Sequence, residues 1–210
     1  MTYINKKLIL TILILTSCAH IDYSDIYDYA KISILGAEDI KIDDVFIKES
    51  KSSFIKAKLG KTLVATLVLA NVEDNIIFEW VGSNGEKIIT KNGRIIETVG
   101  LEHNIQLLNR SEATLALDSD KELLISLYDP SATISQTIKT YDLGIESLEL
   151  DKTYISKSYR EDFTTNNYKW SGSNFYWVDT RTSLPIKTIA SSHPYLDSFE
   201  IEFYYLFGRK

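Results

Sequence analysis

The sequence predicts an all-β fold, in which a large antiparallel meander sheet folds on itself into a barrel-like or sandwich structure with one N-terminal helix packed against it. Tyr is frequent, with 13 Tyr against 8 Phe and 3 Trp, and aromatic residues favour sheet surfaces. Two Asn-Gly turn signals bracket a short strand, and roughly ten further β-rich runs share the chain after residue 40. So many antiparallel strands must curl to bury one face.

The composition indicates one globular domain and narrows the class of partner. Hydrophobic residues make up 44% of the 210 residues, which is enough for an ordinary core. The chain has 29 acidic against 23 basic residues, a net charge of −6. Binding to nucleic acid needs a concentrated basic surface that neutralises phosphates, so nucleic acid is not expected as a partner.

The N-terminus has the layout of an export signal. Lys6 and Lys7 precede an apolar run over residues 8–15, which is too short to span a membrane as a helix. The following Leu-Thr-Ser-Cys, ending at Cys18, resembles the bacterial lipobox, whose Cys receives diacylglycerol and a further acyl chain such as palmitate. A buried N-terminal strand is the alternative. We expect a signal peptide over 1–17 and a single mature β domain over 18–210, with a charge of 21 − 29 = −8.

Lipid at Cys18 would hold the protein on a membrane without spanning it. Cys18 is the only cysteine, and an exported chain with one thiol cannot form an internal disulfide. By resemblance to lipoproteins of enteric type, Ala19 lacks the Asp that favours retention at the inner membrane. The expected location is therefore the outer membrane, on its periplasmic face.

The predicted helix follows the anchor. Asp22 or Ser24 can cap it, and Gly36 can end it. Its apolar stripe is interpreted as a face that docks on a sheet, with a partner site as the alternative. The stripe consists of Tyr23, Ile26, Tyr27, Ala30 and Ile34.

The strands are predicted from local patterns. Residues 62–70 are apolar on both alternating sets, which predicts a central strand covered on both faces. Asn84-Gly85 and Asn92-Gly93 predict two type I′ turns, so that 76–99 form a three-stranded meander around a strand at 86–91. The last strand, 198–207, should face the core with Phe199, Ile201, Phe203, Tyr205 and Phe207. Other strands are expected at 75–81, 114–117, 123–128, 135–143, 152–163, 174–179 and 186–189.

Two stretches of the chain resemble the YjbF/GfcB family of outer-membrane lipoproteins. The longer stretch runs from Ala57 to Leu101, and the shorter is the aromatic strand 174–179 with its following turn, in which Ser183 stands where Gly is usual. The resemblance implies an all-β fold, an association with operons for capsule or exopolysaccharide secretion, and no enzymatic activity. Its elements are Leu59-Gly60, Trp80, Asn92-Gly93-Arg94, Gly100-Leu101, Asn174-Phe175-Tyr176-Trp177-Val178-Asp179, Thr182 and Lys187.

Catalytic motifs are missing from the sequence. His20, His103 and His193 lack the spacing of a metal site, and no nucleophile elbow, Walker loop or dinucleotide fingerprint occurs. We expect no cofactor, no metal and no catalytic residue. The only support for a glycosidase comes from pairs of adjacent acidic residues at 43–44, 73–74 and 161–162. Such neighbouring acids are more often solvated surface charges.

An aromatic and polar segment near residue 170 suggests contact with a glycan, because sugar rings combine apolar C–H faces with hydroxyl groups. The candidate contacts are Tyr168, Trp170 and Tyr176, with Arg94 as a contact for an acidic polymer. The alternatives are packing in the core for the aromatic residues and a surface ion pair, such as one with Glu97, for Arg94. Phe175 and Trp177 are expected on the inner face.

These observations favour a non-enzymatic outer-membrane lipoprotein that acts as an accessory factor in capsule or exopolysaccharide secretion or assembly. Its expected partners are the membrane, through the lipid anchor, proteins of the polysaccharide export machinery, and the polysaccharide itself. The alternative is a periplasmic carrier or binding protein for a glycan or lipidic ligand, which requires a cavity inside the curved sheet.

Overall fold

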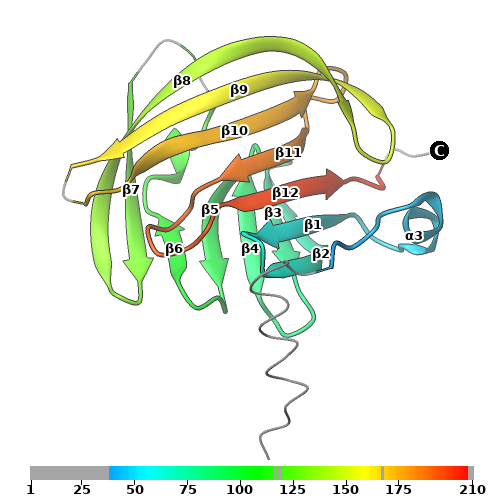
Figure 1. The fold of residues 1–210 in the computed structure, drawn as a ribbon, viewed down its shortest axis with the longest axis horizontal. Coiled ribbons are helices and arrows are strands. Elements are labelled where there is room, and N and C mark those ends of the chain that lie inside the picture. The colour runs from blue at the N-terminus through cyan, green and yellow to red at the C-terminus, as the bar shows by residue number, and fades with distance from the viewer. Residues whose placement is uncertain (1–37, 116, 118–119, 167, 208–210) are drawn as a thin grey trace, which may run out of the picture.

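A computed structural model describes residues 38–115, 117, 120–166 and 168–207. Cys18 and the helix predicted for 22–36 lie outside these residues. The twelve strands of the described chain form a closed antiparallel barrel, in which each strand pairs with its neighbours in the chain and β12 pairs with β1 (Figure 1). The predicted folded-over meander is therefore confirmed as a barrel. The strands are β1 Phe54–Leu59, β2 Leu63–Glu73, β3 Ile77–Val81, β4 Lys87–Lys91, β5 Arg94–Val99, β6 Asn104–Leu107, β7 Lys121–Tyr128, β8 Ala132–Glu149, β9 Thr153–Thr165, β10 Ser171–Asp179, β11 Pro185–Ala190 and β12 Phe199–Tyr204.

The meander gives the barrel two distinct ends. The turns that follow the odd-numbered strands meet at one end, which we call the His103 end after a residue of the β5–β6 turn. The turns that follow the even-numbered strands lie at the other end, which we call the α3 end. A helix, α3 (Asp44–Glu49), sits at that end on the outside of the barrel (Figure 1).

The core lies inside the barrel and is rich in aromatic rings. Trp80 is fully buried, and its indole Nε1 donates a hydrogen bond to Oγ1 of Thr90 at 3.0 Å. The ring of Phe203 packs edge-on against Trp80 at 5.8 Å between centroids. Phe199 and Ile201 are also buried, as predicted for the last strand, whereas Phe207 is exposed because β12 ends at Tyr204.

Helix α3 covers a small apolar area outside the barrel. Asp43 caps it by accepting a hydrogen bond from the backbone N–H of Phe46 at 2.9 Å. Ile47 packs on Phe54 and Tyr204, whose rings stack at 4.9 Å between centroids. This helix was not predicted, because six residues are too few to show helical periodicity.

The strand predicted at 62–70 exists as β2, but the prediction that both faces are covered is wrong. Its outward residue Val68 is exposed, because nothing in the described chain packs outside this part of the barrel. Although β2 is apolar on both faces, one face packs in the core and the other faces outward.

The two Asn-Gly turns differ from each other. Asn92 and Gly93 have φ of 51° and 84°, as a type I′ turn requires, which confirms that prediction. At the other turn only Gly85 has positive φ, and the loop has three residues, 83–85, between Gly82 and Glu86. The side chain of Asn84 donates to the Glu86 carboxylate at 3.0 Å, which holds Asn84 out of the type I′ geometry.

The strand predicted at 114–117 is wrong. A 3-10 helix, Arg110–Glu112, precedes this segment within the long β6–β7 connection. The side chain of Asn109 takes the place of a paired strand, since it donates to the carbonyl of Glu122 and accepts from the N–H of Leu124. The other predicted strands correspond to β3, β4 and β7–β12 with shifted bounds, while β1 and β6 were not predicted as separate strands.

Candidate functional site

A buried ion pair lies inside the barrel. Arg94 begins β5, and its guanidinium Nη2 donates to Oε1 of Glu161 on β9. The Arg94 side chain is 5% exposed and that of Glu161 is 0% exposed. The same carboxylate oxygen accepts a hydrogen bond from Oγ1 of Thr140 at 3.3 Å. Arg94 therefore pairs inside the barrel, and the sequence-based expectation of a surface ion pair for it is wrong.

Tyr176 completes this cluster from β10. The Arg94 guanidinium lies 5.5 Å from the centre of the Tyr176 ring, which is within the range of a cation–π interaction. Burial raises the pKa of Tyr176 well above its ordinary value, and the Glu161 carboxylate adds to this effect against the opposing charge of Arg94. Burial opposes the charge of Arg94, but its interactions with Tyr176 and Glu161 outweigh that effect and raise its pKa. The cluster thus holds one positive and one negative charge beside a neutral phenol.

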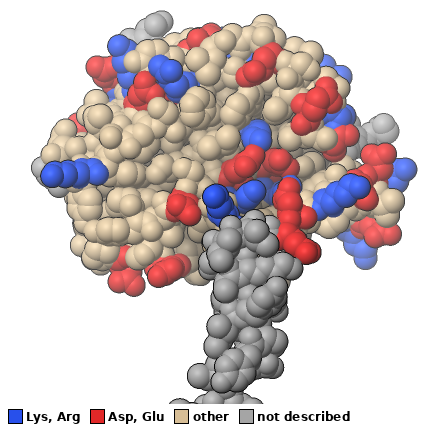
Figure 2. Space-filling model, in the orientation of Figure 1, with Lys and Arg blue, Asp and Glu red and all other residues tan. Residues whose placement is uncertain are grey.

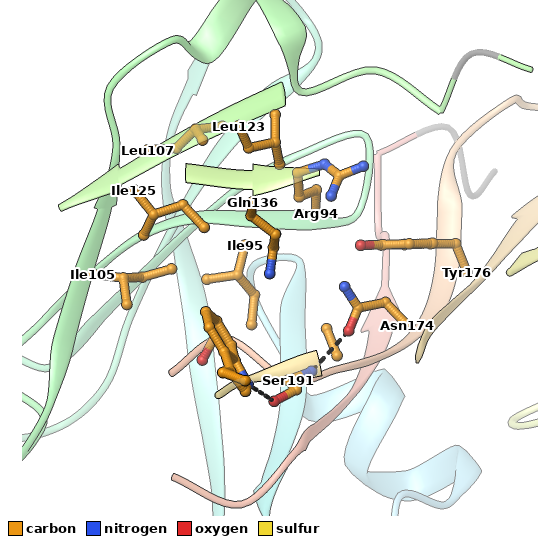
Figure 3. A pocket seen from close by; sticks show the side chains of 13 residues that line it. Arg94, Ile95, Ile105, Leu107, Leu123, Ile125, Gln136, Asn174, Tyr176 and Ser191 are labelled. Carbon is orange, nitrogen blue, oxygen red and sulfur yellow. Dashed lines mark hydrogen bonds between the residues drawn. The ribbon is translucent and has the colours of Figure 1, made fainter. Parts of the chain in front are cut away.

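A cavity of about 30 Å³ lies next to this cluster. Arg94 from β5, Gln136 from β8, and Asn174 and Tyr176 from β10 point into it, and Ile95, Ile105 and Ile125 line its apolar side (Figure 3). A volume of this size corresponds to about one water molecule. Within the described chain, Arg94 Nε makes no hydrogen bond to protein, and a water in this cavity would be its natural partner.

Trp170 borders the same cavity and belongs to the core. Its indole Nε1 donates to Oγ of Ser191 at 3.2 Å, and the N–H of Ser191 donates to Oδ1 of Asn174 at 2.9 Å (Figure 3). The Trp170 ring packs edge-on against Phe163 at 5.0 Å between centroids. This tryptophan is buried and links the β9–β10 turn to β11.

The structure therefore brings together three of the four residues predicted to contact a glycan, but it places them inside the barrel. Arg94, Trp170 and Tyr176 are all buried, so a polymer outside the barrel cannot reach them. Their burial argues against the predicted glycan contact at these three positions.

The facing of β10 is the reverse of the prediction. Asn174 and Tyr176 point inward, whereas Phe175 and Trp177 lie on the outer face and are half-buried. Trp177 Nε1 donates to the carboxylate of Glu146 at 2.7 Å, and Lys187 lies 6.0 Å from the centre of its ring. With this facing, Asn174 and Tyr176 bring polar groups into the interior, where the Tyr176 ring lies beside the Arg94 guanidinium.

Tyr168 lies at the His103 end, among residues from four turns. His103 and His193 stack in parallel at 4.9 Å between ring centroids, and Tyr195 packs at 5.6 Å from His193. A hydrogen bond with Tyr195 raises the pKa of Tyr168. Burial lowers the pKa of His193 to about 4, and the neighbouring His103 adds to this effect. Sequence reasoning placed both histidines in separate loops and missed the stacked pair, because only the barrel's closure brings those loops together.

The adjacent acids do not form the carboxylate pair of a glycosidase. Glu161 points into the barrel while Asp162 accepts from Ser173 at an exposed position, and Asp43 caps α3. In the part of the chain that the structure describes, no group of three or more His, Cys, Asp or Glu residues has the arrangement of a metal site. Nor does any described helix have the length and hydrophobicity that a membrane crossing requires.

Comparison with known protein families identifies the group to which this barrel belongs. A family model described as "Group 4 capsule polysaccharide lipoprotein gfcB, YjbF" matches residues 27–203. The chain belongs to this family. The match includes β1 to β11 in full and β12 as far as Phe203, and the family description names no enzymatic activity.

The chain is also similar to one named relative and to one solved structure. The chain is 25% identical over 191 residues to the uncharacterized lipoprotein GfcB of Escherichia coli K12, which corresponds to 84% of this chain and 87% of the relative. A crystal structure of the hypothetical lipoprotein YmcC from Escherichia coli K12 has a similar fold, with a TM-score of 0.67 at 19% identity. That similarity covers 77% of this chain and 87% of the solved chain, and it confirms the fold alone.

Proposed function

We propose that this protein is a non-enzymatic lipoprotein that is anchored at Cys18 to the periplasmic face of the outer membrane and acts as an accessory factor in capsule or exopolysaccharide secretion or assembly. The observation that carries the proposal is the family match over residues 27–203, whose description joins a capsule polysaccharide with a lipoprotein. The lipobox-like sequence ending at Cys18 supports the anchor, because two or more acyl chains hold a protein stably on a membrane.

The interior of the barrel around Arg94 is packed too tightly to enclose a ligand. The cavity beside Arg94 holds about 30 Å³, far less than the roughly 300 to 1,000 Å³ of a small-molecule site. Aromatic side chains and the Arg94–Glu161 pair fill the space around it. The alternative of a carrier with a ligand inside the barrel therefore receives no support from this cavity.

The outer surface offers polar and charged groups to partners. In Figure 2, charged side chains gather over β1, β11 and β12, where Lys56 pairs with Asp39 and Glu202, and Lys187 pairs with Glu200. The surface above this group carries separate clusters of charged side chains (Figure 2), and on β8 and β9 Lys157 pairs with Asp142 and Arg160 with Asp162. Protein partners of the export machinery or the polymer would meet the barrel on such outer surfaces.

Deletion of the gene tests the proposal. We expect surface polysaccharide to fall several-fold, to return when the wild-type gene is restored, and to stay low with Cys18→Ser, which cannot accept lipid. Immunoblots of membrane fractions should show the wild-type protein in the outer membrane and the Cys18→Ser protein in the soluble periplasm. Unchanged polysaccharide in the deletion strain would refute the accessory role, and full activity of the Cys18→Ser protein would refute the need for an anchor.

A further inference from the structure

An apolar groove opens at the His103 end of the barrel, beside the start of β2. It encloses about 410 Å³, more than ten times the volume of the cavity at Arg94. Its floor consists of inward-facing residues of β1, β2, β4 and β12, and its rim is the β3–β4 turn. The apolar lining includes Leu59, Leu63, Ala65, Leu67, Leu101 and Phe199.

The groove exists because the edge of β2 that faces β3 is unpaired over residues 63–67. Its pairing with β1 runs from Leu63 to Val68, but its pairing with β3 begins only at Val68, opposite Val81. The chain of β3 turns away at Gly82, so the edge of β2 over residues 63–67 stays open in the described structure. An open edge beside exposed apolar side chains is a place where another segment can pack.

The first described residues run toward this groove. Ile42 packs near Phe54 and Tyr204 at the α3 end, and Asp39 pairs with Lys56 at 2.8 Å, further along β1. Read backward, the chain therefore follows β1 toward its end at Leu59. Lys58, which shares a small cleft with Asp39, is next to Leu59, and Leu59 pairs with Phe199 in the groove.

The length of the preceding chain matches the distance. Along β1, Lys56 and Leu59 are roughly 10 Å apart. The four residues between Ile34 and Asp39 span at most roughly 14 Å when extended. The predicted helix over 22–36 ends within this link, and its stripe of Tyr23, Ile26, Tyr27, Ala30 and Ile34 is apolar like the groove. A 12-residue stripe is about 18 Å long as a helix.

We propose that the groove beside β2 is the docking site of this chain's own N-terminal segment, residues 23–34, which binds through that apolar stripe. A segment tethered by four residues is present at an effective concentration of about millimolar or more, so that even weak apolar contacts suffice to seat it. The tether also favours this segment over a free partner of the same affinity. This proposal concerns the purified protein and does not depend on the proposed role in polysaccharide secretion.

Docking would set the distance between the barrel and the membrane. An extended chain from Cys18 to Glu38 could reach roughly 70 Å, whereas a docked helix with five free residues before it reaches roughly 35 Å. With lipid on Cys18, the His103 end would lie near the membrane surface. This orientation step rests on the proposed lipid anchor, but the docking itself does not.

Thiol labelling tests the docking in the mature chain with Cys18→Ser, which has no native thiol. Leu63→Cys probes the groove, and Val68→Cys is the matched control, because Leu63 and Val68 are 48% and 52% exposed on the same strand in the described structure. We expect a maleimide to react with Leu63→Cys at least ten-fold more slowly than with Val68→Cys. The pair Tyr27→Asp and Ile34→Asp, which breaks the stripe, should make the two rates equal.

A second pair of substitutions separates docking from a general change in charge or hydrophobicity. Tyr29→Asp and Ile32→Asp replace the same two residue types at positions outside the stripe of the predicted helix, and they should leave the slow labelling of Leu63→Cys unchanged. Equal rates at both cysteines in the unbroken chain would overturn the proposal, as would slow labelling that survives Tyr27→Asp and Ile34→Asp. If Leu63→Cys fails to fold, the chain without any cysteine can be compared with its Tyr27→Asp and Ile34→Asp variant by hydrogen exchange of the amides of residues 63–67.

Discussion

The ion pair inside the barrel allows a quantitative prediction about Arg94→Met. Methionine keeps most of the side-chain volume, so the main effect is to leave the Glu161 carboxylate, which is 0% exposed, without its cation. Breaking a buried pair in this way costs about 3–5 kcal/mol. The same change removes the cation–π contact with Tyr176, which is included in that figure. We therefore expect unfolding free energy to fall by about 4 kcal/mol.

Urea denaturation followed by tryptophan fluorescence measures this change. With a slope of about 2–3 kcal/mol per molar urea, the midpoint should fall by roughly 1.5 M. Arg110→Met is the matched control, because Arg110 forms a similar contact with Glu97 but is 37% exposed, and breaking it should cost less than about 1 kcal/mol.

A double variant separates the ion pair from simple packing. Arg94→Met combined with Glu161→Leu removes the unpaired charge, and we expect it to recover at least half of the lost stability. If Arg94→Met costs no more than Arg110→Met, or if the double variant loses the sum of two large single effects, then the interior does not penalise an unpaired charge and the reasoning is wrong.

Two further predictions concern the turns of the barrel. The pKa of His193 is about 4 in the folded protein and about 6.5 when unfolded, so its contribution to stability is complete above pH 6.5 and is lost as the pH falls toward 4. We expect the unfolding free energy, measured with urea, to be about 1–2 kcal/mol lower at pH 4.5 than at pH 7.5; the partial solvation of the neighbouring His103 limits this loss. His193→Phe should not show this loss, and an equal loss in both proteins would contradict the prediction. Gly93→Ala should cost about 2 kcal/mol or more, because at φ of 84° its new Cβ would lie 2.8 Å from Cβ of Pro185. Gly85→Ala, at φ of 86° but with nothing within 4 Å, should cost about 1 kcal/mol, and equal thermal shifts for the two variants would show that the contact with Pro185 is irrelevant.

Two features that depend on residues close together in the sequence were predicted correctly, whereas two features that depend on contacts between distant residues were not. Asn92-Gly93 forms the predicted type I′ turn because the signal is local, and the inward face of β12 follows from its alternation. The facing of β10 was predicted the wrong way because it depends on Arg94, 82 residues before Tyr176, which brings a charge into the interior. A charged residue directly after an Asn-Gly turn and directly before Ile95 and Ile96 was the available signal. The exposure of β2 had no such signal, since apolar residues on both faces look alike whether or not a layer covers them.

Closure of the barrel by β1 and β12 has a consequence for how the protein is made. Phe54 pairs with Tyr204, 150 residues later, so one edge of the first strand is paired at once by β2, while the other stays unpaired until almost the whole chain is present. Closing a loop of this length costs roughly 4 kcal/mol of chain entropy, which only the completed set of contacts can offset. A chain that stops before Phe199 would expose two strand edges, at β1 and β11, and should be removed by proteases or aggregate. Pairing of the last strand thus distinguishes complete from truncated chains, because only a chain that includes β12 can pair both strand edges.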